Sequence, residues 1–252
     1  MISVCIATYN GEKYIKEQLD SILLQLGETD EIVISDDNST DKTIEIISNY
    51  NDHRIKIFQH TKNEKLKTMT AAPFRLAANN FENAIKNAQG DFIYLSDQDD
   101  IWHPDRIIRT QAYLEKYDLT MCNYKVINNE GHVLDEKFFK KNPVSKILLK
   151  NILTIPFRGC CMSFRREILD YCIPLPKACI GHDYWIGYMV THLGSFKYID
   201  ETLHLYRKHY NNVSFERGKS KNSLWFKISY RIKLMCQIIL YATKYRLRKI
   251  CN

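Results

Sequence analysis

The first hundred residues alternate between short apolar runs and segments whose apolar positions recur every three or four residues. The apolar runs predict four strands, at residues 2–8, 31–35, 54–58 and 92–95. The helical spacing predicts three helices between them, at residues 12–25, beyond the capping triplet 39–41, and at 73–87. Strands separated by helices are typical of βαβ units, so we expect a mostly parallel sheet with helices on both faces.

The pattern of the second half is less regular. It predicts helices from His103 to about Lys116 and at residues 183–192, with a helical turn at 168–171. Strands are predicted at residues 119–127, 161–164, 196–199 and 203–206. The whole pattern indicates an α/β protein, and in such proteins ligands bind where the strands of the parallel sheet end.

A different pattern occupies the end of the chain. Apolar side chains recur there at helical spacing, at Trp225, Ile228, Ile232, Met235 and Ile239. From Arg217 to Asn252 there are ten Lys or Arg residues and no Asp or Glu. We therefore predict a basic amphipathic helical segment over 216–252, with Leu234 and Ile238 off its main stripe. Such a helix can pack against the rest of the chain or lie on an anionic membrane surface. We expect it to lie on the membrane surface.

Charge is therefore unevenly distributed along the chain. The net charge is +7, but residues 1–216 carry 26 basic and 29 acidic groups. A slightly acidic body argues against a general nucleic-acid-binding protein, and we expect only the basic tail to meet an anionic partner.

The eight cysteines include no CxxC pair, and most of them lie in apolar runs. This predicts buried, reduced thiols of a cytosolic protein rather than a zinc site or a disulfide framework. The first residues, Met1 to Cys5, contain neither a basic region nor a long apolar run, so no signal peptide is expected. No apolar stretch reaches the ~20 residues that span a bilayer.

Three acidic residues directly after the fourth predicted strand are the most informative motif, Ser96-Asp97-Gln98-Asp99-Asp100. Carboxylates crowded in this way repel one another unless a cation lies between them, and their oxygens suit Mg²⁺ or Mn²⁺. Such an ion usually completes its coordination with phosphate oxygens, which suggests a diphosphate-containing substrate. The alternative is that Asp99 or Asp100 caps the helix that begins near Pro104.

Two more polar loops are expected beside this one. They follow the first two strands, as Ala7-Thr8-Tyr9-Asn10 and Asp36-Asp37-Asn38-Ser39. The carboxyl ends of parallel strands meet at one edge of a sheet, so the three loops should form one crevice. A carboxylate of the second loop either accepts hydrogen bonds from a nucleobase or ribose, or only shapes an Asx turn before a capped helix.

The second half supplies two further polar motifs. In Gly181-His182-Asp183-Tyr184-Trp185, Asp183 is either a helix cap or a general base that takes a proton from a sugar hydroxyl. In Tyr206-Arg207-Lys208-His209, the cations are either solvated or balance a diphosphate, and a ring nitrogen of His209 can complete a metal coordination shell.

Taken in order, these motifs resemble those of family 2 glycosyltransferases with the GT-A fold, a Rossmann-like, mostly parallel sheet with helices on both faces. The resemblance covers roughly Ile2 to Ser214 and rests on residues 3–11, 35–41 and 90–100. The motifs at 181–185 and 206–209 are similar to those of bacterial O-antigen and capsule polysaccharide transferases. Ala7 departs from the family pattern, which commonly has proline there.

The resemblance implies contacts to a nucleotide sugar. Thr8 and Tyr9 would lie along the nucleoside, with Asp37 at the base, and Arg207 would close over the diphosphate. The GT-A domain would comprise residues 1–215, with a nucleotide-binding half at 1–100 and an acceptor-binding half at 101–215.

The resemblance also implies the chemical groups of the reaction. Asp97 and Asp99 would form the DxD motif that binds Mn²⁺ or Mg²⁺, and Asp97 would contact the nucleotide sugar as well. His209 would be a further metal ligand, and Asp183 would be the catalytic base.

We therefore predict an inverting, metal-dependent hexosyltransferase. It would move a galactose-, glucose- or rhamnose-type unit from a nucleotide-diphosphate sugar to a hydroxyl of a lipid-linked saccharide, in the synthesis of bacterial surface polysaccharide. We expect it in the cytoplasm, peripheral on the inner membrane through residues 216–252.

Two alternatives come from other classes of protein. A metal-dependent sugar nucleotidyltransferase would normally show a glycine-rich basic loop, whereas Asn10-Gly11-Glu12-Lys13 has a single glycine. A non-catalytic interaction protein with a basic, nucleic-acid-binding tail is disfavoured because the acidic body carries the motifs and the tail contains no recognised nucleic-acid module.

Overall fold

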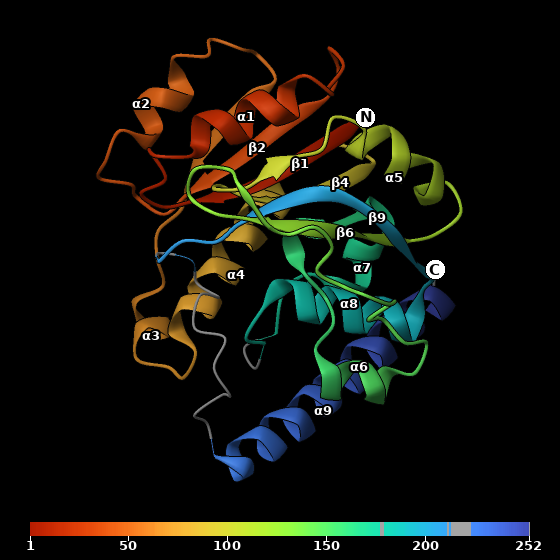
Figure 1. Ribbon diagram of the computed structural model, residues 1–252. Helices are drawn as coiled ribbons and strands as arrows, with labels where there is room; N and C mark the ends of the chain where they lie inside the picture. Colours follow the sequence, from red (N-terminus) through yellow and green to blue (C-terminus); the bar gives the residue numbers. More distant parts are fainter. Residues whose placement is uncertain (177–178, 211, 213–222, 252) are drawn as a thin grey trace.

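A computed structural model of the protein describes residues 1–176, 179–210, 212 and 223–251 (Figure 1). These residues form one nine-stranded sheet in the order β3-β2-β1-β4-β8-β6-β9-β5, with β7 paired to β6. The predicted boundary between residues 215 and 216, and the predicted end of the resemblance at Ser214, lie outside the described residues.

The first half of the chain builds the parallel part of the sheet. Its strands are β1 (Ile2–Thr8), β2 (Glu31–Asp36), β3 (Ile55–Gln59) and β4 (Phe92–Asp97). The helices between them are α1 (Ile15–Leu23), α2 (Thr43–Ser48), the short α3 (Glu64–Lys67) and α4 (Ala72–Asn87). The four predicted strands and three predicted helices are confirmed, and α3 is an addition.

The second half extends the sheet and makes it mixed. Its strands are β5 (Ile101–Trp102), β6 (Leu119–Ile127), β7 (Val133–Asp135), β8 (Met162–Arg165) and β9 (Phe196–Arg207). Its helices are α5 (Arg106–Leu114), α6 (Leu148–Thr154), α7 (Leu169–Cys172) and α8 (His182–Leu193), with 3-10 turns at Gly159–Cys161 and Arg166–Ile168. The strands β8, β5 and β7 run antiparallel to their neighbours, and β9 runs parallel to β6.

The two strands predicted at 196–199 and 203–206 are one strand, β9. The register between β6 and β9 shifts on both sides of Asn123, and Thr202 lies opposite this residue. The Asn123 side chain leaves the ladder and binds the Phe139 backbone, with Nδ2 2.8 Å from its carbonyl oxygen and Oδ1 3.0 Å from its nitrogen. A bulge of this kind lets a polar segment pass through a strand without ending it.

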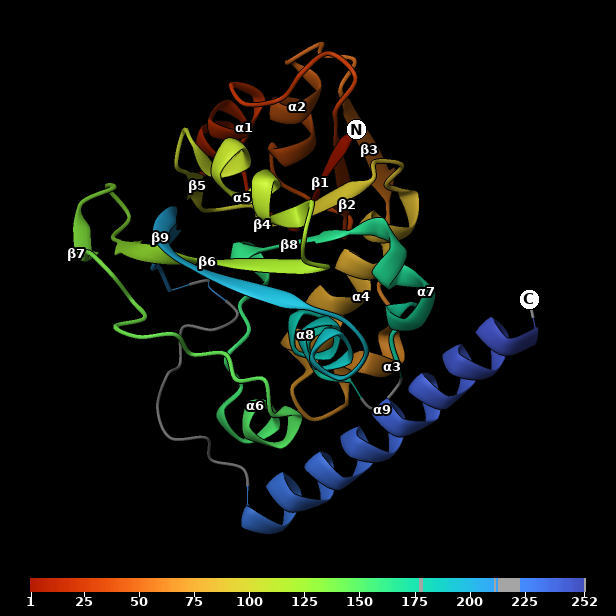
Figure 2. The same cartoon turned by 90° about the vertical axis from the view of Figure 1, so that its right-hand side faces the viewer.

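Helices cover both faces of the sheet, as predicted (Figure 2). Side chains alternate along β1, so Val4 and Ile6 join a core with α1, α2 and α5, whereas Cys5 joins a second core with α4 and α8. Six of the cysteines are buried, and Cys236 and Cys251 are exposed.

The predicted C-terminal helix is present as α9 (Leu224–Cys251) and packs across α7 and α8. Leu234, Ile238 and Ala242 form its buried face, and the ring of Tyr241 lies 5.0 Å from that of Trp185. Most side chains of the predicted stripe are exposed, at Trp225, Ile228, Ile232 and Ile239, so the stripe does not pack on α7 and α8, and its contact with a membrane stays a prediction. In the described part of the chain, no helix is both long enough and apolar enough to cross a membrane.

Candidate active site

Three polar loops meet at the carboxyl ends of β1, β2 and β4, as predicted, and the crevice between them stays a prediction. Gln98 makes two hydrogen bonds to Tyr9, from Tyr9 N to Oε1 at 2.9 Å and from Nε2 to Tyr9 O at 3.1 Å. Asn10 N donates to Ser39 Oγ at 2.9 Å, and Asp37 N donates to Thr8 O at 2.9 Å. Each of the three loops is therefore held by hydrogen bonds to another.

Asp36 organises the second loop, a role that the sequence did not reveal. Its Oδ1 accepts from Thr8 Oγ1 at 2.7 Å and from Ser39 Oγ at 2.6 Å, and its Oδ2 accepts from Ser39 N at 2.7 Å. The buried Thr8 hydroxyl is thus turned toward Asp36. An Asx turn, as one reading of the motif predicted, is present further along at Asp41, whose Oδ1 accepts from Thr43 N at 3.0 Å.

Asp37 and Tyr9, which belong to two of these loops, each have a basic partner. Asp37 Oδ1 lies 2.5 Å from Nδ1 of His60, and the carboxyl is almost fully buried. The ring of Tyr9 is exposed, with Nζ of Lys62 3.0 Å from its centroid. The nucleoside contacts of Thr8, Tyr9 and Asp37 stay predictions.

The acidic motif forms a compact cluster at the end of β4. One carboxylate oxygen each of Asp97, Asp99 and Asp100 lies within 4.8 Å of the other two. Burial, reinforced by the neighbouring Cys160 thiol and the other two carboxyls, raises the pKa of Asp97 well above its ordinary range. Crowding that opposes ionisation is relieved when a cation binds between the carboxylates.

Asp99 is joined to the segment after β9. Its Oδ2 lies 2.6 Å from Nε2 of His209 and accepts a hydrogen bond of 3.1 Å from Nδ2 of Asn212. The structure thus brings His209 to the acid cluster, where the sequence placed a metal ligand. Asn212 is an additional polar neighbour whose role the sequence did not specify.

Arg207 lies beside the cluster but is buried, with its guanidinium already engaged. It donates from Nε to the Asp99 carbonyl at 3.0 Å, from Nη1 to the Asn129 carbonyl at 2.9 Å, and from Nη2 to Glu17. It also lies over the Tyr14 ring. In this conformation the side chain fastens β9 to α1, so the predicted diphosphate contact requires it to leave Glu17 and stays a prediction.

Asp100 does not cap the following helix. Helix α5 begins without a side-chain cap, and Asp100 instead accepts from Arg207 N at 2.8 Å through Oδ1 and from His204 Nε2 at 2.8 Å through Oδ2. The capping alternative for this residue is therefore wrong. Its partners lie more than one hundred residues downstream, where no local pattern could indicate them.

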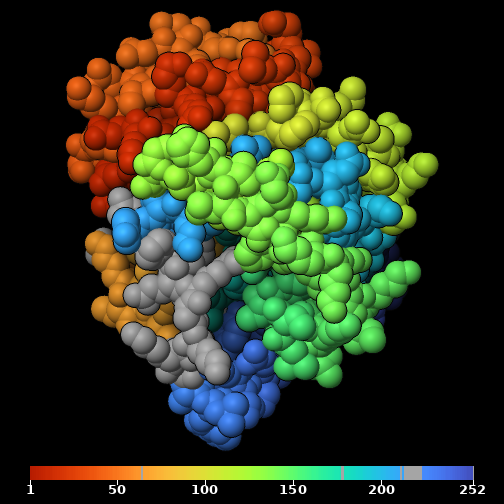
Figure 3. All heavy atoms as spheres, viewed as in Figure 1, coloured from red at the N-terminus to blue at the C-terminus, as the bar shows by residue number. Residues whose placement is uncertain are grey.

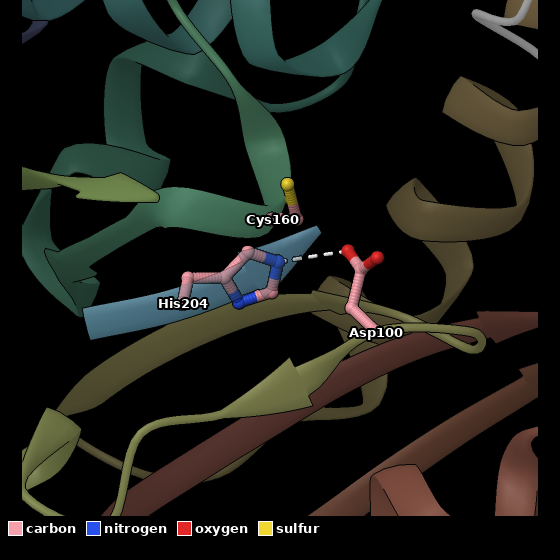
Figure 4. A group of neighbouring side chains, drawn as sticks. All are labelled: Asp100, Cys160 and His204. Atoms are coloured by element: carbon pink, nitrogen blue, oxygen red, sulfur yellow. Dashed lines mark hydrogen bonds and ion pairs between the residues drawn. The ribbon is translucent and has the colours of Figure 1, made fainter. Parts of the chain in front are cut away.

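Asp100, Cys160 and His204 form a second buried group of possible ligand atoms (Figure 4). Nη1 of Arg106 lies 2.7 Å from His204 Nδ1, and a guanidinium can only donate. The proton of the neutral ring is therefore on Nε2, which donates to Asp100. A metal at Nε2 would have to displace this proton while Nδ1 still faces Arg106, so the group is a hydrogen-bond network rather than a metal site.

Asp183 occupies the first turn of α8 and binds the backbone next to Cys160. Its Oδ2 accepts from Gly159 N at 3.2 Å, its Oδ1 accepts from Tyr184 N at 2.8 Å, and its charge contributes to the raised pKa of Asp97. A Cβ at residue 159 would lie 2.9 Å from Nε2 of His182, so a glycine at this position lets the backbone of residue 159 lie close to the start of α8. Asp183 is thus both a helix-start residue and an oriented carboxylate beside the acid cluster.

The residues present fit a hard divalent cation. Asp97 and Asp99 offer carboxylate oxygens, and His209 offers a ring nitrogen 2.6 Å from Asp99. Oxygen ligands with one imidazole suit Mn²⁺ and Mg²⁺ better than a soft metal.

Comparison with known proteins identifies relatives along most of the chain. Residues 3–172 match the family described as Glycosyl transferase family 2. An uncharacterized glycosyltransferase of Nostoc sp. is 28% identical over 94% of this chain and 74% of its own. The dTDP-rhamnosyl transferase RfbG of Shigella flexneri is 30% identical over 82% of this chain and 72% of its own. The putative glycosyltransferase EpsE of Bacillus subtilis is 33% identical over 54% of this chain and 44% of its own.

Solved structures share the fold. The crystal structure of Staphylococcus aureus TarS 1-349 in complex with UDP-GlcNAc has a TM-score of 0.64 at 20% identity, over 94% of this chain and 72% of that one. Glucosyl-3-phosphoglycerate synthase from Mycobacterium tuberculosis, in complex with Mn²⁺, UDP and phosphoglyceric acid, has a TM-score of 0.56 at 18% identity, over 96% and 78%.

Proposed function

Because this chain belongs to glycosyl transferase family 2 and has the GT-A fold, we propose that it transfers a sugar from a nucleotide-diphosphate sugar to an acceptor hydroxyl. One observation carries the proposal: the Asp183 carboxylate accepts from Gly159 N, and the next residue, Cys160, has its thiol within 4.8 Å of a carboxylate oxygen of Asp100 in the acid cluster. A general base and a pair of metal-binding carboxylates in one crevice are the groups that this transfer needs.

On the donor side, Asp97, Asp99 and His209 would hold Mn²⁺ or Mg²⁺. The bound ion would offset negative charge on the nucleoside diphosphate. The loop that carries Tyr9 and the loop that carries Asp37 are tied together, so both would present their side chains to the nucleoside in a fixed arrangement.

On the acceptor side, Asp183 takes the proton of the attacking hydroxyl. Hydrogen bonds from Gly159 N and Tyr184 N hold its two oxygens and so fix the orientation of the carboxylate. The acceptor oxygen forms its bond to the anomeric carbon as the bond to the diphosphate breaks. Attack from the opposite face inverts the configuration at that carbon.

The relatives favour a hexosyl or deoxyhexosyl unit as the group transferred. RfbG is named a dTDP-rhamnosyl transferase and matches 82% of this chain, which favours a rhamnose-type donor over the galactose and glucose types. The TarS structure contains UDP-GlcNAc, so N-acetylhexosamine donors belong in the same test. The acceptor we propose is a lipid-linked saccharide of bacterial surface polysaccharide synthesis.

A lipid-linked acceptor requires access to a membrane, and α9 could provide it. Its exposed residues include Trp225, Ile232 and Ile239, and residues 224–251 contain seven Lys or Arg and no Asp or Glu. A helix with this composition can lie on an anionic bilayer while its other face stays packed on α7 and α8. We therefore place the enzyme at the cytoplasmic face of the inner membrane.

Metal-dependent donor hydrolysis across a panel of nucleotide sugars tests the proposal. We expect release of the nucleoside diphosphate from one donor class, whereas a nucleotidyltransferase would exchange pyrophosphate instead. Asp183→Asn should keep donor binding but lower kcat by ~10²-fold or more in transfer to an acceptor. Asp170→Asn, at an exposed residue of α7, is the matched control. Transfer by the Asp183 variant at the wild-type rate would show that the base is another group.

A further inference from the structure

A short helix of the second half, α6, exposes aliphatic side chains beside lysines. Leu149 is 56% exposed, Leu153 57% and the preceding Ile147 64%. Lys146 and Lys150 are exposed next to them. Large aliphatic side chains gathered in this way on a seven-residue helix mark a surface that meets an apolar partner.

The charge around α6 is of one sign. From Lys137 to Arg166 there are eight Lys or Arg residues and no Asp or Glu. Lys141, Lys146 and Lys150 are exposed, and within the described residues none of the three forms an ion pair. The segment therefore combines cations that form no ion pair with exposed aliphatic groups, and this pairing is complementary to an anionic lipid surface.

The surface of α6 is rigidly mounted on the catalytic domain. Ile152 is buried, and the Asn151 side chain bonds the Ser145 backbone on both sides, with Oδ1 2.8 Å from Ser145 N and Nδ2 2.7 Å from Ser145 O. Nδ2 also donates to Thr191 Oγ1 of α8 at 3.1 Å. One face of the helix is thus fixed inward, so Leu149 and Leu153 remain outward.

Both α6 and α9 pack against α8, the helix whose first turn holds Asp183. Figures 1 and 2 place α6 and the first half of α9 at the end of the molecule opposite α1 and α2, and Figure 3 shows the start of α9 projecting there. We infer that α6 is a second membrane-docking element, which binds an anionic bilayer together with α9. Two contacts separated along the surface fix the orientation of the crevice relative to the bilayer, which a single helix cannot do.

This inference rests on the proposed membrane association of α9, and flotation of the full-length chain with lipid vesicles tests it. The vesicles would be neutral phosphatidylcholine or the same lipid with phosphatidylglycerol. We expect Leu149→Ser/Leu153→Ser to weaken binding to the anionic vesicles by about tenfold, since two aliphatic anchors are lost. Each of Lys146→Gln and Lys150→Gln should weaken it about fivefold.

The control is Leu134→Ser in β7, because Leu134 is 58% exposed but stands beside Asp135 and Glu136. This variant should bind the vesicles as the wild type does. A Trp225→Ser/Ile232→Ser variant tests α9 separately.

If the α6 variants bind like the wild type while the α9 variant releases the vesicles, the role of α6 is overturned and membrane association by α9 stands. If the wild type itself does not bind anionic vesicles, both are overturned. Donor hydrolysis without vesicles measures the sugar-transfer proposal independently of either result. Unchanged thermal unfolding of each variant shows that lost binding is not lost folding.

Discussion

His204 Nε2 donates a hydrogen bond of 2.8 Å to Oδ2 of Asp100, although the two residues lie 104 positions apart in the chain. The ring accepts from Arg106 on its other side, at 2.7 Å, so it joins a buried cation to a buried carboxyl. Asp100 in turn accepts from Arg207 N, which ties the loop after β4 to β9. Two segments that frame the acid cluster are thus held together through one imidazole.

We expect His204→Ala to be strongly destabilising. It leaves Arg106 and Asp100 buried without their bridge, which costs about 3–5 kcal/mol in the free energy of unfolding. Urea unfolding measures this loss. The same variant should need more Mn²⁺ for half-maximal activity, because the loop that carries Asp99 is loosened.

The control for this variant is His192→Ala, at an exposed residue near the end of α8. Equal stability of the two alanine variants would show that the hydrogen-bond network of His204 contributes nothing to the free energy of unfolding. An intact Mn²⁺ response of the His204 variant would separate its structural role from any effect on the metal site.

Removal of the metal is the second prediction. A chelator should abolish donor hydrolysis, and Mn²⁺ or Mg²⁺ should restore it. Asp99→Asn should raise the metal concentration for half-maximal activity by ~100-fold or more, since even outer-shell partners of a metal account for 10–100-fold. Asp105→Asn, just before α5 and without a side-chain capping bond, is the matched variant and should respond to Mn²⁺ like the wild type. Activity that survives chelation would show that the reaction does not require a metal.

The first hundred residues were predictable because local pattern and global topology agree there. The apolar runs at 2–8 and 92–95 are β1 and β4, and parallel strands bring their polar ends together wherever the helices lie. The meeting of these loops could therefore be predicted from strand order alone. The partners of Asp100 could not, because they come from β9 and nothing near residue 100 indicates them.

The second half was harder for two physical reasons. Helix α6 and strand β7 are too short to show a period, and the polar residues 200–202 resemble a turn although a bulge carries β9 through them. In α9 the helical period was correct, but the pattern did not indicate which residues pack on α7 and α8. Apolar side chains lie on two sides of this helix, and only the tertiary contacts decide which side is buried.

The third prediction concerns pH. Burial lowers the pKa of His182 below its ordinary value of 6.5, and its ring stacks on Phe81 at 4.1 Å. Between the two pKa values the unfolded chain binds a proton that the folded chain does not, so stability rises with pH. The contribution is fully present above pH 6.5 and is lost as the pH falls toward the folded-state pKa. The slope for one such group is at most about 1.4 kcal/mol per pH unit.

Urea unfolding at several values between pH 7.5 and 5 checks this slope. The variant His182→Asn should be less stable at every pH. Its free energy of unfolding should decrease less steeply as the pH falls, because one titrating group is gone. His192→Asn, which removes an exposed histidine, should leave the slope unchanged. A slope identical in the wild type and the His182 variant would mean that the pKa of His182 is the same in the folded and unfolded chains.

Two adjacent isoleucines of α9 provide the last prediction, because they separate the two apolar faces of the helix. Ile238 is fully buried against α8, whereas Ile239 is 57% exposed. Ile238→Ala should lower the free energy of unfolding by about 2–5 kcal/mol through the lost burial and the cavity that remains. Ile239→Ala should change it by less than ~0.5 kcal/mol, as exposed substitutions usually do.

Vesicle binding should respond in the opposite order. Ile239→Ala removes one of the apolar groups that we assign to the bilayer, so it should weaken flotation with anionic vesicles. The Ile238→Ala variant, measured where it is still folded, should float with these vesicles as the wild type does as long as α9 stays packed on α8. If Ile238→Ala did not change the free energy of unfolding, α9 would not be packed on α8 in solution. If Ile239→Ala were silent in both measurements, the exposed face of α9 would have no lipid partner, and its apolar side chains would need another explanation.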